Sequence, residues 1–343
     1  MNSLNEEKGT VKYIFAMENQ KPYILWLAGA ILLFFPLWGH AAPKNGFDIG
    51  LGAGYRKDEM AFSIRQGGEL LYKESDRNLL GVALDAFLDL RISGLLWANR
   101  ADFGWYVSGQ THDIAFMGVP ALAHYRATFN QSARGFFADI EESLGFIFDF
   151  TDRKGGFKIV PQGGYSVFYQ QLTRGSPHSG TNIAAAAMSC NLSHGRLRRQ
   201  WRGWRVGGDV IYQLLHAWTF EASYFYYFLH FKQTFDAFED MAYLAPGPIV
   251  SSEYFIRMNT RFAGSGAHGQ CVNTKITAKV AEQWKVNWRL MIDWFQLPEK
   301  NCVVHQEFRR VLPSASAVSI RESATFQTWW HSLSSLIEVE YFF

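Results

Sequence analysis

The chain has 343 residues, of which 48% are hydrophobic and 16% aromatic, and its 33 basic residues nearly balance its 31 acidic ones. A mean hydropathy of −0.10 excludes a bundle of membrane-spanning helices, and the balanced charge is atypical of a nucleic-acid-binding protein. An aromatic-rich chain of near-neutral hydropathy is typical of a transmembrane β-barrel, because half of each strand faces water.

One long apolar run, residues 23–38, has a lysine before it and small residues after it. This pattern predicts a signal peptide over residues 1–41, cut after Ala41. Met17 is an alternative initiator, because the leader is otherwise unusually long. A single membrane anchor is the alternative interpretation of the run, and Pro36 near its end disfavours it.

The remaining chain, residues 42–343, alternates apolar and polar residues with a period of two, which predicts β-strands. The alternating segments follow in this order: 47–64, 70–90, 92–109, 138–150, 157–169, 204–212, 218–235, 272–280, 284–294 and 333–343. A turn at Gly67-Gly68 ends the first segment. Later short connections lie near Arg91, Gly155, His216 and Gln283, and long connections cover 110–134, 174–197, 236–269 and 298–327.

This sorting of connection lengths predicts an all-β fold, a transmembrane antiparallel up-and-down β-barrel of about ten strands. Both chain ends and the short turns would face the periplasm, and the long loops would lie outside the cell. A soluble β-sandwich is the alternative, but it gives no reason for loop lengths to be sorted in this way.

The last eleven residues carry the clearest alternation and end on a free aromatic carboxy-terminus. Phe343, with Tyr341 and other apolar residues at every second position before it, resembles the closing strand of outer-membrane β-barrels. In those proteins the strand is the signal for the barrel-assembly machinery. Tryptophans near strand ends fit aromatic girdles at the two membrane interfaces. They are Trp201, Trp204, Trp218, Trp284, Trp288, Trp294, Trp329 and Trp330.

Strand lengths, strand count and loop order together resemble the omptin family of ten-stranded outer-membrane barrels, which includes surface proteases. Residues 48–52, 70–90 and the strand ending at Gly109 are similar to that family's first three strands, and residues 200–226 to its sixth and seventh. The resemblance spans the mature chain as a pattern, without a long exact motif. It implies an outer-membrane location in a cell of Gram-negative type.

Omptin proteases carry an Asp-x-Asp pair after the third strand and an Asp-x-His pair after the seventh, so that a His beside a carboxylate activates water. The first place here reads Thr111-His112-Asp113 and the second Asp236-Ala237-Phe238. Asp113 and Asp236 remain, but the second Asp and the His are replaced. His112 could be a relocated base, although a lone His there is more often an ordinary loop residue. The proteolytic site is therefore predicted to be absent.

The polar faces of the predicted strands carry charges that would point into the lumen. Opposite charges in a narrow ten-stranded barrel are expected to pair and fill it, whereas general porins have roughly 16 strands. A small selective pore lined by these charges is the alternative. The candidate lumen charges are Asp139, Glu141, Arg289, Asp293, Glu338 and Glu340.

Arg198 and Arg202 share the parity of Val206 and Val210, which belong to the predicted lipid-facing stripe. They would point outwards just above the membrane, where guanidinium groups can bind the phosphates of lipopolysaccharide in a bidentate fork. Omptins are similar in binding lipopolysaccharide through a basic outer patch. The alternative interpretation is a solvated strand tip.

Three cysteines, Cys190, Cys271 and Cys302, allow one disulfide at most within the chain, and their spacing does not choose the pair. No close-spaced ligand motif predicts a metal, and no cofactor is expected. The sequence thus favours an integral outer-membrane barrel with a surface-exposed structural or interaction role and no proteolytic activity. The alternatives are a small pore, and a peptidase that uses Asp113, His112 and Asp236 in an altered arrangement.

Overall fold

The computed structural model describes residues 45–119, 122–150, 155–174, 188–214, 217–244, 251–310 and 317–343. The predicted signal peptide lies outside the described residues. Within these ranges, no helix is long and apolar enough to cross a membrane.

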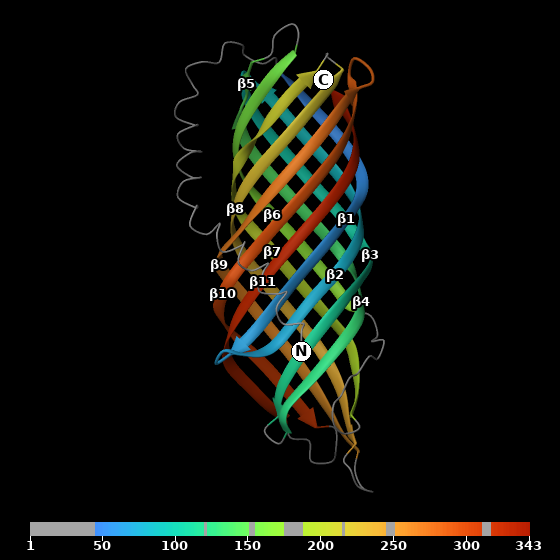
Figure 1. Cartoon of the computed structure of the whole chain (residues 1–343), viewed down its shortest axis with the longest axis vertical. Helices are drawn as coiled ribbons and strands as arrows, with labels where there is room; N and C mark the ends of the chain where they lie inside the picture. Colours follow the sequence, from blue (N-terminus) through green and yellow to red (C-terminus); the bar gives the residue numbers. More distant parts are fainter. Residues whose placement is uncertain are drawn as a thin grey trace, which may run out of the picture.

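Ten long strands close into a single antiparallel barrel (Figure 1). Consecutive strands pair around the ring, β1 pairs with β11, and β4 pairs with β6. The two-residue β5 pairs with the start of β6 and follows β4 after one residue. The prediction of a ten-stranded antiparallel barrel is therefore confirmed. The elements are β1 (Gly46–Gln66), β2 (Glu69–Ile92), β3 (Leu95–Val119), β4 (Leu122–Phe146), β5 (Phe148–Asp149), β6 (Gly155–Arg174), β7 (Met188–Leu214), β8 (Trp218–Leu244), β9 (Ser251–Lys279), β10 (Trp284–Arg310) and β11 (Ala317–Phe342).

The first and last strands meet at the end of the barrel that carries the short turns, here called the short-turn end. Asp48 pairs with Phe342 there, and the backbone N–H of Phe343 donates to the carbonyl of Phe47 at 3.0 Å. Ser93 and Gly94 form the tight turn between β2 and β3 with positive φ angles of 50° and 87°. Such a turn matches the right-handed twist of the strands that it joins.

Where the structure describes the four segments predicted as long irregular loops, it shows strand instead. β3 runs to Val119 and β4 starts at Leu122, with Thr111 paired to Gln131 between them. β7, β8, β9, β10 and β11 extend in the same way, so the opposite end of the barrel, here called the hairpin end, consists of long hairpins. The prediction of irregular loops was wrong for these described residues. The segments lack regular alternation, but backbone pairing between strands needs no particular side chain.

The two faces of the strands separate as the period of two predicts over the half of the barrel near the short-turn end. Leu51 and Ile337 are 67% and 64% exposed on the outer face, whereas Glu338 is fully buried. Six of the eight predicted girdle tryptophans lie on the outer face, but Trp201 and Trp330 are only 1% exposed inside the barrel. Their positions have the parity of the inward residues, so the girdle prediction was wrong for these two.

Glycines on the inner face of β1 permit the strong curvature of this small barrel. A Cβ added at Gly50 would lie 2.1 Å from Cε1 of Phe87, whose ring covers that glycine. At Gly54 an added Cβ would lie 2.0 Å from the carbonyl oxygen of Ser335 on β11. Closure between the first and last strands therefore depends on the missing side chain.

Two β-bulges face each other across the β9–β10 ladder at the hairpin end. β9 carries an extra residue relative to β8 near Gly266, whose φ is +88°, and β10 carries one relative to β11 between Leu297 and Lys300. The β9–β10 pairs stop at Gln296 with His268 and resume, in unchanged register, at Val303 with Arg261. Unpaired backbone is costly in hydrocarbon, so this stretch of β9 and β10 is expected to lie outside the membrane core.

Candidate functional site: the barrel lumen

A row of carboxylates crosses the inner wall on neighbouring strands. Asp85 of β2 pairs in register with Asp102 of β3, which pairs with Asp139 of β4. On the other side, Gly52 of β1 separates Asp85 from Glu338 of β11. All four carboxylates are buried. Like charges directly opposite each other on adjacent strands repel, so this row requires cations.

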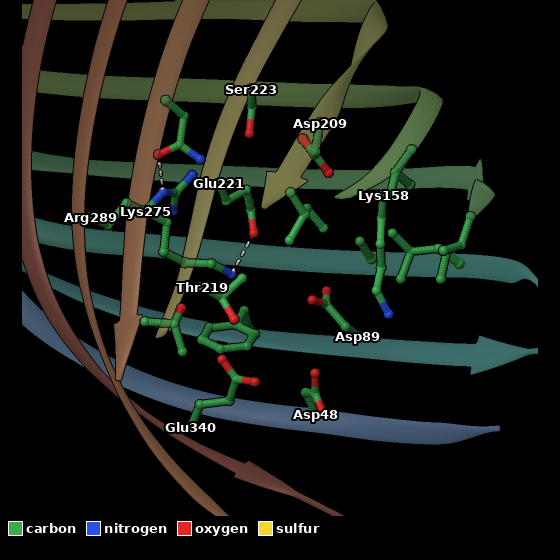
Figure 2. A pocket seen from close by; sticks show the side chains of 18 of the residues that line it. Asp48, Asp89, Lys158, Asp209, Thr219, Glu221, Ser223, Lys275, Arg289 and Glu340 are labelled. Carbon is green, nitrogen blue, oxygen red and sulfur yellow. Dashed lines mark hydrogen bonds and ion pairs between the residues drawn. The ribbon is translucent and has the colours of Figure 1, made fainter. Parts of the chain in front are cut away.

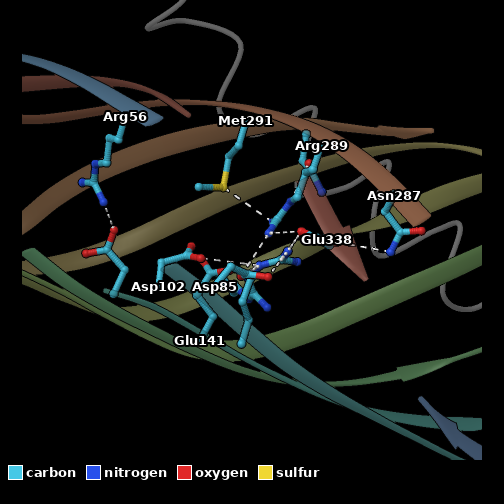
Figure 3. A network of polar contacts seen from close by, with 12 residues as sticks. Arg56, Asp85, Asp102, Glu141, Asn287, Arg289, Met291 and Glu338 are labelled. Carbon is cyan, nitrogen blue, oxygen red and sulfur yellow. Dashed lines mark hydrogen bonds and ion pairs between the residues drawn. The ribbon is translucent and has the colours of Figure 1, made fainter. Parts of the chain in front are cut away.

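Arginines of β1, β3 and β10 supply that charge (Figure 3). Arg100 contacts Asp85 through Nε at 2.7 Å and also binds Glu338 through Nη2. Nη1 of Arg289 lies 3.9 Å from each of the same two carboxylates. Arg56 binds Asp139 and lies 2.9 Å from its other partner, Asp58. Arginine suits such buried bridging because its planar fork contacts two carboxylates at once.

Beyond this layer, toward the hairpin end, aromatic side chains fill the lumen. Phe295 lies 4.7 Å from both Phe168 and Trp330, measured between ring centroids, and Phe262 stacks on Phe326 at 4.5 Å. The rings come from seven of the ten strands and form one contiguous cluster, here called the aromatic plug. Its members are Phe62, Phe168, Trp201, Tyr227, Phe231, Phe262, Phe295, Phe326 and Trp330. Packing of this kind leaves little room for a water path.

At the short-turn end the lumen instead widens into a cavity of about 720 Å³, here called the vestibule (Figure 2). Its lining includes Ala217 and Glu282 from two turns and Phe342 near the carboxy-terminus. The charges of the lining balance. Eight are acidic, Asp48, Asp89, Glu141, Asp149, Asp209, Glu221, Glu282 and Glu340, and eight are basic, Arg91, Arg100, Lys158, Arg205, Lys275, Lys279, Lys285 and Arg289.

Most of these charges form ion pairs across the vestibule wall. Nζ of Lys275 lies 3.1 Å from a carboxylate oxygen of Glu221, and Nζ of Lys158 lies 2.8 Å from Asp149. Deeper in the lining, Arg205 contacts Glu141 at 2.7 Å. Arg91 also pairs with Asp48, and Lys285 pairs with both Asp48 and Glu340.

All six predicted lumen charges are buried inside the barrel. Glu141 accepts a hydrogen bond from the Tyr227 hydroxyl at 2.9 Å, and Glu340 accepts one from the Asn287 amide at 2.9 Å. Asp293 is 2% exposed and pairs in register with Cys271. The described residues offer no group of His, Cys, Asp and Glu that could hold a metal ion.

Sequence reasoning missed Arg56, Arg100 and Asp102, although they are central to the buried network. All three lie within the predicted strand segments 47–64 and 92–109, but the candidate lumen charges did not include them. Parity was the available signal, because Arg56 continues the inward positions of Gly50 to Gly54.

The two predicted lipopolysaccharide-binding arginines, Arg198 and Arg202, are both exposed on the outer face of β7. Nε of Arg198 donates to Oε1 of Gln171 on β6 at 3.2 Å. Arg202 pairs in register with His230 of β8, and it lies two residues from the exposed Trp204 on the same face.

The predicted assembly signal forms an aromatic cluster at the rim of the barrel. Phe343 stacks on Phe47 with ring centroids 4.0 Å apart, and Tyr341 lies 4.4 Å from Phe343. Trp284 of β10 contacts Tyr341 at 4.8 Å. The carboxy-terminal aromatics thus touch both neighbouring strands, β1 and β10.

The weak catalytic candidates have a described backbone only. His112 and Asp113 lie in β3, where they pair with Ser75 and Glu74 of β2, and Asp236 lies in β8. On the shorter way round the barrel, three strands separate β3 from β8. The side chains of these three candidates lie outside the described part of the chain, as does that of Cys190. Cys271 and Cys302 are free, buried thiols, so they do not form a disulfide with each other.

The Pom family model, described as Protochlamydia outer membrane protein, matches residues 50–343. The chain belongs to this family. The match covers the whole described barrel except the first residues of β1, so this Pom family member is an outer-membrane protein. A search of curated protein sequences gives no match.

Among solved structures, the Pom barrel is similar to the outer membrane protease OmpT from Escherichia coli. The two share 8% sequence identity with a TM-score of 0.57, over 89% of this chain and 99% of OmpT. A FadL homologue of Pseudomonas aeruginosa gives a TM-score of only 0.31 at 8% identity, over 86% of this chain and 90% of that one. At such identities the likeness concerns the fold alone, so the omptin-like architecture is supported while membership of the omptin family stays a prediction.

Proposed function

We propose that this Pom family protein is a closed outer-membrane barrel with a structural or interaction role at the cell surface, and neither a general pore nor a protease. The observation that carries the proposal is the aromatic plug. Its nine rings include Trp201, Phe231, Phe326 and Trp330, each at most 1% exposed. Side chains this well packed exclude water, so a permanently open path along the lumen is not expected.

The ion-pair layer supports the same conclusion. Arg100 and Arg289 bridge carboxylates on different strands, and Arg56 joins β1 to β4. Water-filled porins keep an aqueous channel in barrels of roughly 16 strands, whereas narrower barrels are filled by side chains. The charges of this lumen therefore serve to hold the wall together more than to attract permeating ions.

The long hairpins support a role outside the membrane. A β-strand needs only about 9–11 residues to cross a bilayer. The ten strands of this barrel are 20 to 29 residues long. More than half of the longest strands therefore lies outside the hydrocarbon core. The hairpin end would present this surface to partners.

A proteolytic role has less support. The resemblance to omptin proteases places Thr111 and Phe238 where that family has a catalytic Asp and the catalytic His. A threonine cannot supply a carboxylate, and a phenylalanine cannot accept a proton. Likeness of fold does not carry the activity without the site.

Ion conductance tests the closed barrel. Refolded mature protein, residues 42–343, is inserted into planar bilayers, with folding verified by heat-modifiable mobility in gels. We expect no discrete conductance steps. A variant with Phe295→Ala and Trp330→Ala, which removes two adjoining rings of the plug, is expected to give flickering steps. Reproducible steps from the unaltered protein would contradict the proposal and favour a small selective pore.

The small pore remains the second candidate because of the vestibule. A cavity of about 720 Å³ with sixteen charged lining residues, eight of each sign, would admit ions at the short-turn end. Movement of the plug and of the ion pairs around Arg56, Arg100 and Arg289 would then complete a path.

We further propose that Arg198 and Arg202 contact lipopolysaccharide phosphates. Both are exposed, Lys232 on the neighbouring strand adds a third exposed cation, and the outward Trp204 marks the membrane interface two residues away. Arg198→Ala with Arg202→Ala is expected to reduce the lipopolysaccharide that co-purifies with the folded barrel several-fold. Arg65→Ala with Lys300→Ala removes two exposed cations elsewhere and serves as the control. Equal retention by both double variants would contradict this assignment.

A further inference from the structure

At the mouth of the vestibule, residues of like charge lie directly opposite each other on adjacent strands in two places. Asp48 of β1 pairs in register with Asp89 of β2, and Lys279 of β9 pairs with Lys285 of β10. Directly opposed like charges destabilise a sheet. All four residues line the same cavity. A folded barrel that carries both pairs at one opening has a local electrostatic cost, which calls for a functional reason.

Only one member of each pair has an ion-pair partner among the residues that the structure describes. Asp48 binds Arg91 and lies 3.7 Å from Lys285, and Lys285 also binds Glu340. Among the described residues, neither Asp89 nor Lys279 has an ion-pair partner. Of the charged lining residues, Asp89, Asp209 and Glu282 on the acidic side and Lys279 on the basic side form no ion pair within the described part of the chain.

The placement of Asp89 and Lys279 defines a dipole across the opening. Three strands, β1, β11 and β10, separate β2 from β9 on the shorter way round the ten-stranded ring, so the two groups belong to nearly opposite walls. Figure 2 shows the Asp89 carboxylate pointing into the hollow, with Asp209 on the far side. Asp209 of β7 accepts a hydrogen bond from Gln162 and forms no ion pair with the described residues, so it adds a second such carboxylate.

The size and charge of the vestibule narrow the class of ligand. Its volume of about 720 Å³ lies in the range of small-molecule pockets. An anion or a cation alone would meet as many repelling as attracting groups, because the lining carries eight charges of each sign. A molecule with an ammonium group at one end and a carboxylate at the other would match Asp89 on one wall and Lys279 on the other.

We propose that the vestibule binds a short peptide with free termini, which enters from the short-turn end. Its ammonium terminus contacts Asp89, and its carboxylate terminus contacts Lys279. The ion pairs around Lys275 and Lys285 form the fixed wall between these two groups.

The proposal is tested with trialanine and the folded mature barrel in detergent. Equilibrium dialysis with labelled peptide measures the binding. We expect saturable binding that falls about five- to tenfold when the peptide is N-acetylated, and by a similar factor when it is C-amidated. Asp89→Asn should weaken trialanine binding to the same degree but leave binding of the N-acetyl peptide unchanged. Lys279→Gln should likewise weaken trialanine binding but leave binding of the C-amidated peptide unchanged.

Glu282→Gln is the matched control, because it neutralises a lining charge in the turn that the proposal does not assign. We expect it to bind trialanine like the unaltered protein. Heat-modifiable mobility verifies that each variant is folded. Absence of saturable trialanine binding to the folded, unaltered barrel would overturn the proposal. Equal affinity for free and capped peptides, or equal effects of the three substitutions, would overturn it as well.

Discussion

The two halves of the barrel are built with opposite polarity, although the same ten strands form both. Near the short-turn end, Leu51 and Ile337 face outwards and Glu338 is buried. Near the hairpin end, Phe62 and Trp330 are buried in the lumen, and Arg202 is exposed on the outside. β1 and β11 thus exchange their apolar and polar faces along their length.

The solvent around each half explains this exchange. A strand within the bilayer is most stable with apolar side chains toward lipid, so its polar residues collect in the lumen and must pair there. A strand above the bilayer is surrounded by water, so its apolar residues collect inside as they do in a soluble protein. The hairpin half is therefore a soluble β-barrel with an aromatic core, standing on a membrane half with an ionic core.

The largest expected effect comes from breaking the aromatic core. Phe295→Ala with Trp330→Ala removes two buried rings that contact each other at 4.7 Å. Each such truncation costs about 3–5 kcal/mol of unfolding free energy. Urea unfolding in detergent measures the loss. Trp204→Ala, on the outer face at 67% exposure, is the control and should change stability little. Equal losses of unfolding free energy in the double variant and in Trp204→Ala would mean that the plug is not a core.

Breaking the ionic core comes next. Arg100→Ala leaves Asp85 and Glu338 without their main cation, and unpairing a buried charge costs about 3–5 kcal/mol. The carboxylates then repel each other, and protonation relieves the repulsion. The variant should therefore recover part of its deficit relative to the unaltered protein as the pH falls. Adding Glu338→Gln should also recover part of it at neutral pH. A deficit that grows in acid would refute the assignment.

The smallest of the three expected effects comes from placing a charge on the outer face of one strand, either toward lipid or toward water. Ile337 and Ser323 are both exposed on β11, one in each half of the barrel, and share the same parity. Ile337→Lys places a charge toward lipid and should cost about 2–4 kcal/mol in bilayers if its site lies near the midplane. Ser323→Lys should be neutral. Unfolding in lipid vesicles provides the measurement, and similar costs at both sites would remove the boundary between the halves.

This exchange of faces also explains which features could be predicted from the sequence. The membrane half follows one rule, apolar residues toward lipid, so parity located the strands, the short connections near Arg91 and Gln283, and the closing strand ending at Phe343. The predicted short connections near Gly155 and His216 fall largely outside the described residues. The same rule gave the wrong side for Trp201 and Trp330, because inward aromatics belong to the other half. The hairpin segments mix the two patterns and contain many small polar residues, so they resembled loops.

The lumen was predictable in composition but not in its contacts. Parity placed Asp139 and Glu338 inside, where both are buried. The row that joins them through Asp85 and Asp102 depends on the register between strands, which a single sequence does not specify. The partners of Arg100, one of them 238 residues away along the chain, depend on closure of the barrel and could not be predicted either.

The opposed bulges of β9 and β10 have a consequence for how this chain tolerates insertion and deletion. β9 carries one extra residue relative to β8, and β10 carries one relative to β11. β9 and β10 remain in register with each other on both sides of the gap. One insertion therefore compensates the other. Deleting Gly266 alone would shift one flank by a residue and turn Phe262 from the core to the surface, whereas deleting Glu299 as well would restore the phase. The two extra residues are expected to be gained or lost together during evolution.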